Sequence, residues 1–167
     1  LLDLVAVSIA CDIVPMTGEN RVLAHLGLQC LHHSPSIGLW ALMQRTNRPV
    51  PLNINDLVFA VGPLINAAGR LGDARDAVRL MLSADRHSAL DYAGKLVHKN
   101  KERRTVDHLM AGEATGRILA QPGLETNKSI VLFSSEWHKG IIGIAASRMA
   151  ERFHRPAVIL TESNGRA

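Results

Sequence analysis

Cysteine and aromatic residues are scarce in this sequence. Its 167 residues include two cysteines, Cys11 and Cys30, and 4% aromatic residues. So few cysteines in a chain of this length argue against a disulfide-stabilised secreted domain and favour the reducing environment of the cytoplasm. No uncharged apolar run reaches about 18 residues, the length of a membrane-spanning helix, and the apolar start lacks the basic leader of a signal peptide.

Glycine and proline are also too few for a low-complexity chain, at 13 and 7 residues. The apolar fraction of 47% argues against a disordered tail, and the length suits one domain or parts of two. The first residue is not methionine and the last residues directly follow a strand-like run, so we expect a piece cut at both ends. A net charge of +4 only weakly suggests a polyanionic partner, because many soluble domains carry that charge.

The spacing of apolar residues predicts a mainly helical first part. Leu4–Ile9 is a short β-branched run typical of a buried strand, with Asp12 just beyond its end. Residues 65–72 have two glycines around one arginine and suit either a phosphate-contacting segment or a structural turn. Residues 85–119 contain no proline and predict one or two helices spanning about 50 Å, a bridge between two lobes. Other helices are expected over 20–32, around 39–43, from 55 or 56 to 62, and after Asp73.

The last part of the chain predicts a strand, a helix and a second strand. Apolar runs at Ile130–Ser134 and Ala157–Leu160 flank an apolar helical segment over 141–153. This order forms a βαβ unit and therefore a parallel sheet, which places the chain in the α/β class with a break between lobes near Gln121. Because part of a sheet lacks its neighbours, we also expect an exposed apolar surface.

Four places carry side chains suited to chemistry. Asp12 suits Mg²⁺ or Mn²⁺, although an aspartate before a proline-containing loop also caps turns. Asn66 and Arg70 lie among small residues and suit phosphate, unless the segment is a structural turn. Trp137–Gly140 precede a helix and suit an anion or a stacked base, unless Trp137 packs at a sheet edge. His32 and His33 point about 100° apart and favour an exposed helix end, and Asn100, Arg103 and Arg104 suit either a basic groove or a solvated helix face.

Four stretches together resemble one family. They are LDLVAVSIACDIVPMTGENR from Leu2, GPLINAAGRLGD from Gly62, NKERR from Asn100 and EWHKGIIGIAASRMAERFHRPAVIL from Glu136. In order and spacing they are similar to the RecJ exonucleases of the DHH phosphoesterase superfamily. The resemblance implies the end of a DHH-type parallel-sheet lobe over 1–62, a phosphate-contacting segment and long connecting helix over 63–120, and the start of the DHH-associated, nucleic-acid-binding lobe over 121–167.

The resemblance also implies a function and a set of residues. RecJ enzymes hydrolyse single-stranded DNA from the 5′ end in DNA repair and recombination, using two Mn²⁺ or Mg²⁺ ions. Asp12 matches the last metal-binding aspartate, and it should face the same crevice as Arg70. The single-stranded DNA would be bound by Asn66, Arg70, Trp137, His138, Lys139 and Gly140, and a single-strand-binding protein and a helicase are expected partners.

Three departures limit what this chain should do alone. It lacks the upstream DxD, single-Asp and DHH motifs that supply most metal ligands, and it stops before the family's GSGRS-like motif. Leu64 also stands where the family commonly has arginine. We therefore expect the isolated chain to be inactive. Two alternatives stay open: a DHH phosphodiesterase acting on short oligonucleotides or cyclic dinucleotides, and a catalytically inactive nucleic-acid-binding relative.

Overall fold

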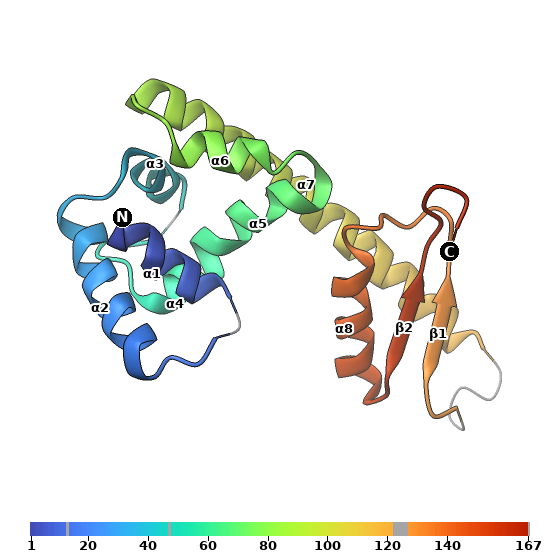
Figure 1. Cartoon of the computed structure of the whole chain (residues 1–167). Coiled ribbons are helices and arrows are strands. Elements are labelled where there is room, and N and C mark those ends of the chain that lie inside the picture. Colours follow the sequence, from blue (N-terminus) through green and yellow to red (C-terminus); the bar gives the residue numbers. More distant parts are fainter. Residues whose placement is uncertain (13, 47, 122–126, 167) are drawn as a thin grey trace. The chain divides into compact units, whose positions relative to one another are not determined.

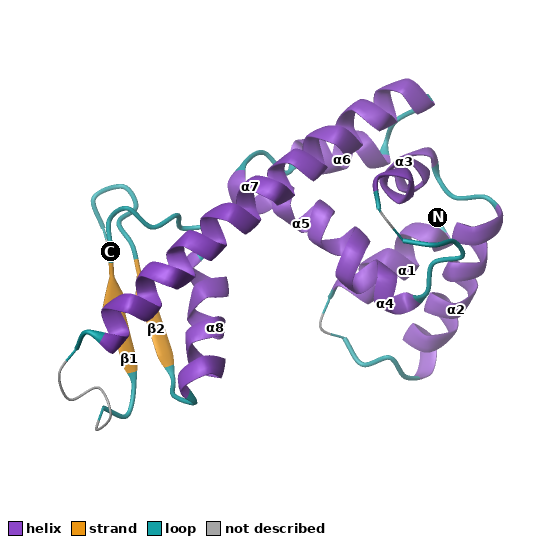
Figure 2. Ribbon diagram, turned by 180° about the vertical axis from the view of Figure 1, so that it is seen from behind, coloured by secondary structure: helices purple, strands orange, loops and turns teal. Residues whose placement is uncertain are grey.

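The chain divides into two compact units in the computed structural model, Leu1–Asn100 and Lys101–Ala167. The structure describes residues 1–12, 14–46, 48–121 and 127–166. Figures 1 and 2 show that the first unit is helical and that both strands belong to the second. The boundary between the two compact units falls within the long helix Arg86–Leu119. It differs from the domain boundaries at 62/63 and 120/121 that the family resemblance implies. Those domain boundaries stay a prediction.

Unit 1 consists of short helices around one apolar core. The core collects buried leucine, valine and alanine side chains, among them Leu39, Leu57 and Leu96. The elements are α1 (Leu2–Cys11), α2 (Gly18–His33), α3 (Ile37–Arg45), α4 (Ile54–Asp56), the π-helical turn η1 (Leu57–Val61), α5 (Gly62–Leu71) and α6 (Arg75–Met81). Helices α2, α3 and α6 confirm the sequence interpretation, and the helix expected to begin at 55 or 56 begins at Ile54.

The strand predicted over Leu4–Ile9 is wrong, because these residues belong to helix α1. Its buried residues are Asp3, Ala6, Val7 and Ala10, a spacing of three or four that matches one face of a helix. The structural turn considered as one alternative over 65–72 is also wrong. These residues form most of α5, which starts at Gly62 with a proline in its first turn and buries Leu64, Ala67 and Ala68.

Two close contacts fix the position of α1 in unit 1. Gly27 of α2 lies so near α1 that a Cβ atom there would stand 2.2 Å from the Leu2 carbonyl oxygen. The buried Asp3 carboxylate accepts hydrogen bonds from the main-chain N–H of Leu4, at 2.9 Å, and of Ser36, at 2.7 Å. Asp3 thereby joins the start of α1 to the start of α3, so α1 is held against both neighbouring helices.

Unit 2 contains the predicted βαβ unit. Strands β1 (Ile130–Phe133) and β2 (Ala157–Leu160) pair in parallel, with Ile130 opposite Ala157, and α8 (Ile142–Phe153) connects them. The sequence predicted one or two helices over 85–119, and the structure has a single helix, α7 (Arg86–Leu119). The residues of α7 from 101 onward belong to unit 2.

The two-stranded sheet buries only one face. Ile130, Leu132 and Ile159 are at most 6% exposed. The alternate residues Val131, Phe133, Val158 and Leu160 are 37–58% exposed. The exposed apolar surface expected from the sequence therefore exists on this sheet. No helix in the described part of the chain has the length and apolar character needed to cross a membrane.

Candidate functional site

Asp12 follows the last residue of α1 and is exposed. The sequence interpretation placed it beyond a strand, and the structure corrects this to the carboxyl end of a helix. Helix carboxyl ends carry partial negative charge from their carbonyl groups, which favours a cation there. A positive ion at this place would therefore be attracted both by the end of α1 and by the Asp12 carboxylate.

Asp12 shares a hollow of about 440 Å³ with Asn66. Asn66 lines it from α5, and the remaining walls are Leu4, Val7, Ser8, Cys11, Ile65 and Met81. Both predicted polar residues thus border one opening of unit 1, although 54 positions separate them in the sequence. An amide and a carboxylate that border one opening provide hard oxygen ligands for a divalent ion and an N–H donor for a phosphate oxygen.

Cys11 forms the inner side of this hollow next to Asp12. Its half-buried thiol lies 3.9 Å from the Leu57 carbonyl oxygen, and burial raises the pKa of the thiol. A Cβ atom on Gly62 would stand 2.5 Å from this sulfur, so the glycine leaves the space that the thiol fills. The expectation that Cys11 is a packing residue fits this contact.

Arg70 is exposed one helical turn after Asn66 on α5, so both side chains leave the same side of that helix. Arg70 lies outside the set of residues that lines the hollow, and its sharing a crevice with Asp12 stays a prediction. Leu64, in the place where the family commonly has arginine, is 7% exposed in the core of unit 1. At this position the chain therefore has apolar packing and no charged side chain.

Trp137 is buried in unit 2, and its expected contact with a base stays a prediction. The residue is 5% exposed, and the Arg117 guanidinium lies over its ring with 5.0 Å to the ring centroid. Trp137 Nε1 donates a hydrogen bond to Glu113 at 2.9 Å, and its carbonyl oxygen accepts one from Thr161 Oγ1 at 2.6 Å. The alternative of a packing residue at the end of a strand describes this side chain.

The neighbours of Trp137 remain at the surface. His138 and Lys139 are exposed; the Gly140 N–H donates to His138 Nδ1 at 3.1 Å, and Lys139 Nζ lies 3.5 Å from Ser163 Oγ. The N–H groups of Ile141 and Ile142 donate to the His138 carbonyl oxygen. These main-chain bonds occupy N–H groups at the start of α8, so exposed side chains rather than the helix end offer contacts to a DNA strand.

Glu113 and Arg117 are the residues that sequence analysis missed. They are four residues apart on α7 and form an ion pair, and Arg117 also donates to the Phe133 carbonyl oxygen at 2.8 Å. Together they attach the segment after β1 to α7. A glutamate followed by arginine at this spacing is a recognisable helix pair, but nothing in the sequence indicates that Trp137 joins it.

The other candidate residues from the sequence lie at a helix end or in the interior of the protein. His32 and His33 end α2 and are exposed as expected, with His32 Nε2 2.6 Å from the Leu52 carbonyl oxygen. Asn100 is 6% exposed, so it belongs to the interior rather than to a solvated face. Over residues 1–12, 14–46, 48–121 and 127–166, no three His, Cys, Asp or Glu side chains gather closely enough to hold a metal ion.

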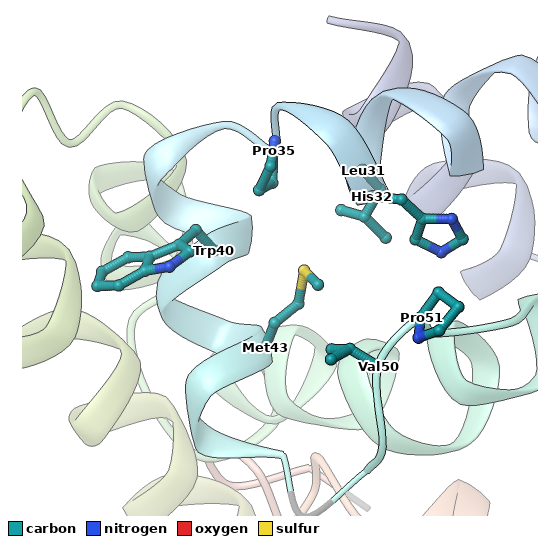
Figure 3. Close-up of a pocket in the computed structure, with 7 residues that line it drawn as sticks. All are labelled: Leu31, His32, Pro35, Trp40, Met43, Val50 and Pro51. Carbon is teal, nitrogen blue, oxygen red and sulfur yellow. The ribbon is translucent and has the colours of Figure 1, made fainter.

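A second hollow of unit 1, of about 410 Å³, is largely apolar (Figure 3). Its walls come from the end of α2, from α3 and from the segment around Val50 and Pro51. Figure 3 shows the sulfur-containing side chain of Met43 between Pro35 and Val50, with His32 beside Pro51. Neither Asp12 nor Asn66 borders this hollow, so it is separate from the candidate site.

Comparison with known proteins gives one consistent result. No family model matches the chain. Curated proteins do: the chain is 36% identical over 161 residues to the single-stranded-DNA-specific exonuclease RecJ of Bacillus subtilis and 38% identical over 164 residues to that of Salmonella typhimurium, covering 96% and 95% of this chain. The chain is a RecJ-like sequence. The matches cover 20% and 28% of those two RecJ proteins, so the chain spans less than a third of their length.

Solved RecJ structures support the same assignment. The crystal structure of Thermus thermophilus RecJ in complex with Mn²⁺ matches with a TM-score of 0.86 and 34% identity, covering 96% of this chain and 24% of that one. The Mg²⁺ complex from the same organism matches with a TM-score of 0.84 and 35% identity, covering 96% and 25%. The α/β class is confirmed, with the parallel pair of strands in unit 2.

Proposed function

We propose that this chain forms part of a metal-dependent exonuclease that degrades single-stranded DNA from the 5′ end in DNA repair and recombination. The observation that carries the proposal is the shared hollow of Asp12 and Asn66, in a chain similar to RecJ over 95% or more of its length. The curated relatives are named as single-stranded-DNA-specific exonucleases. A cytoplasmic location and contacts with a single-strand-binding protein and a helicase would suit this activity.

Asp12 is the residue of this chain that would hold a divalent metal ion. Its carboxylate is a hard oxygen ligand suited to Mn²⁺ or Mg²⁺, and the end of α1 adds negative potential at the same place. When a pair of such ions is bound, they stabilise the attacking and leaving oxygens of a phosphodiester displacement. Because one carboxylate cannot retain two ions, we expect the isolated chain to hydrolyse no DNA.

Asn66 and Arg70 would bind the phosphates of the strand next to Asp12. The Asn66 amide offers N–H donors at the rim of the hollow, and the Arg70 guanidinium suits two-point contact with a phosphate. In unit 2, the exposed side chains of His138 and Lys139 would contact the strand, while Trp137 and the Gly140 N–H hold His138 in place. Such contacts position the strand without reading its sequence.

The test is Asp12→Asn in the longer protein that contains this chain. We expect Mn²⁺-dependent hydrolysis of 5′-phosphorylated single-stranded DNA to fall by more than the about 10–100-fold typical of losing an outer-shell partner of a metal. Asp91→Asn is the matched control, because Asp91 is an exposed aspartate on α7. An unchanged rate for Asp12→Asn would remove Asp12 from the metal site. A parent with no metal-dependent hydrolysis at all would favour an inactive nucleic-acid-binding relative.

A further inference from the structure

Unit 2 contains a hollow of about 210 Å³ between α7 and the segment that follows β1. Its walls are Val106, Leu109, Met110 and Glu113 of α7 together with Glu136, Trp137 and His138. We propose that this hollow receives one unstacked nucleobase of a single-stranded nucleic acid. The proposal rests on the proposed function, since it concerns the strand that the exonuclease would bind.

The size and charge of the hollow favour a base over a phosphate. A drug-sized ligand needs about 300 Å³ or more, so this hollow suits a single ring system. Glu136 borders it, and its exposed carboxylate would repel the negative charge of a phosphate group, whereas the charge of Glu113 is balanced by its ion pair with Arg117. The side chains of Val106, Leu109 and Met110 offer an apolar surface on α7, and Leu109 is 66% exposed there. The flat, apolar face of a base can cover that surface.

The polar groups around the hollow supply one donor and one acceptor. Because Gly140 donates its N–H to His138 Nδ1, the neutral imidazole carries its proton on Nε2 and can donate from there. The exposed Glu136 carboxylate can accept a hydrogen bond from an amino or imino group of a base. Each of the four bases has such a donor beside an acceptor, so the hollow would take any of them. This tolerance suits an enzyme that must process DNA of every sequence.

The wall formed by Trp137 is held in place before any strand binds. Glu113 accepts from Trp137 Nε1, Arg117 lies over the ring, and Thr161 donates to the Trp137 carbonyl oxygen. These contacts fix the residue directly before His138, which limits the movement of the imidazole. A preformed wall reduces the ordering cost of binding, which is one reason why a small hollow can contribute to affinity.

The experiment measures binding of short single-stranded oligonucleotides to the whole 167-residue chain by fluorescence anisotropy at fixed salt. We expect one abasic position, moved along the oligonucleotide, to weaken binding by about fivefold at a particular register, the scale of losing one base contact. Leu109→Asn should weaken binding of the intact oligonucleotide by a similar factor and abolish the effect of the abasic position. Leu119→Asn is the control, because Leu119 is also on α7, is 65% exposed and does not border the hollow.

Two results would overturn the proposal, and they differ in what else they affect. Binding that is insensitive to both the abasic position and Leu109→Asn would refute the base pocket and leave the proposed exonuclease function intact. Failure of the chain to bind any single-stranded oligonucleotide would refute the base pocket and also the proposed strand contacts of this chain, whereas the exonuclease function is tested separately by Asp12→Asn in the longer protein. An oligonucleotide with 2-aminopurine at the sensitive register adds a direct readout: its emission should rise on binding to the unchanged chain and to Leu119→Asn, and stay low with Leu109→Asn.

Discussion

Replacing Gly27 with alanine should loosen the packing of α1, the helix that ends at Asp12. The new Cβ atom would lie 2.2 Å from the Leu2 carbonyl oxygen and 2.6 Å from Ala6 Cβ, whereas ordinary contacts begin near 3.4 Å. The main-chain oxygen cannot rotate away as a side chain can. Helix α1 would therefore have to move by roughly 1 Å relative to α2.

The size of the effect follows from two opposing contributions. Overpacking that shifts a backbone costs about 3 kcal/mol at the upper end of its usual range, while alanine gains about 1 kcal/mol over glycine in a helix. We expect Gly27→Ala to lower the free energy of unfolding of unit 1 by about 2 kcal/mol. With a urea m-value of about 2 kcal/mol/M, the midpoint should fall by about 1 M.

Urea unfolding followed by circular dichroism, with hydrogen exchange of α1 and α2 to locate the change, measures this effect. Gly69→Ala in α5 is the control, because its Cβ would meet nothing within 4 Å, and it should stabilise unit 1 by about 0.5–1 kcal/mol. Adding Ala6→Gly to Gly27→Ala should restore little, since the Leu2 carbonyl oxygen remains in the way. If Gly27→Ala were as stable as Gly69→Ala, the close packing of α1 on α2 would be refuted.

The sequence correctly predicted the elements that have a long uninterrupted pattern or clearly separated apolar runs. Helix α7 has no proline over more than thirty residues, and β1, α8 and β2 alternate apolar runs with clear breaks, so both parts were predicted correctly. Helix α1 was missed because a six-residue apolar run with valine and isoleucine also suits a strand. The better signal lay in its small residues: Ala6 and Ala10 share a face with Asp3 and Val7 only if the segment is helical.

The sequence indicated which residues to consider for the candidate site, but it did not indicate how they lie relative to one another. Asp12 and Asn66 were selected for their side-chain chemistry and for their match to family motifs, whereas their common hollow depends on α1 meeting α5, which no local pattern specifies. The contacts of Trp137 were not predictable for the same reason. Its partner Glu113 is 24 residues away on α7, and only the folded unit brings the indole N–H to that carboxylate.

Two further predictions concern pH and self-association. Burial alone would raise the pKa of Asp3, but the hydrogen bonds from Ser36 and Leu4 together lower it by more than burial raises it. The pKa of Asp3 is therefore below its usual value. The stabilisation that depends on the Asp3 charge should thus be present above about pH 4 and be lost as the pH falls through the lowered pKa; Asp3→Asn should remove this part of the acid dependence in urea titrations, and an unchanged acid limb would contradict it. The exposed sheet face should make the isolated chain self-associate, because soluble monomers rarely leave a contiguous apolar patch uncovered. Phe133→Lys should reduce the association measured by sedimentation, since Phe133 is 49% exposed and a charge there opposes burial of the face. Leu82→Lys places the same charge on an exposed leucine of unit 1, 77% exposed and outside the sheet, and should leave the association unchanged; equal effects of both variants would show that net charge, rather than this face, controls it.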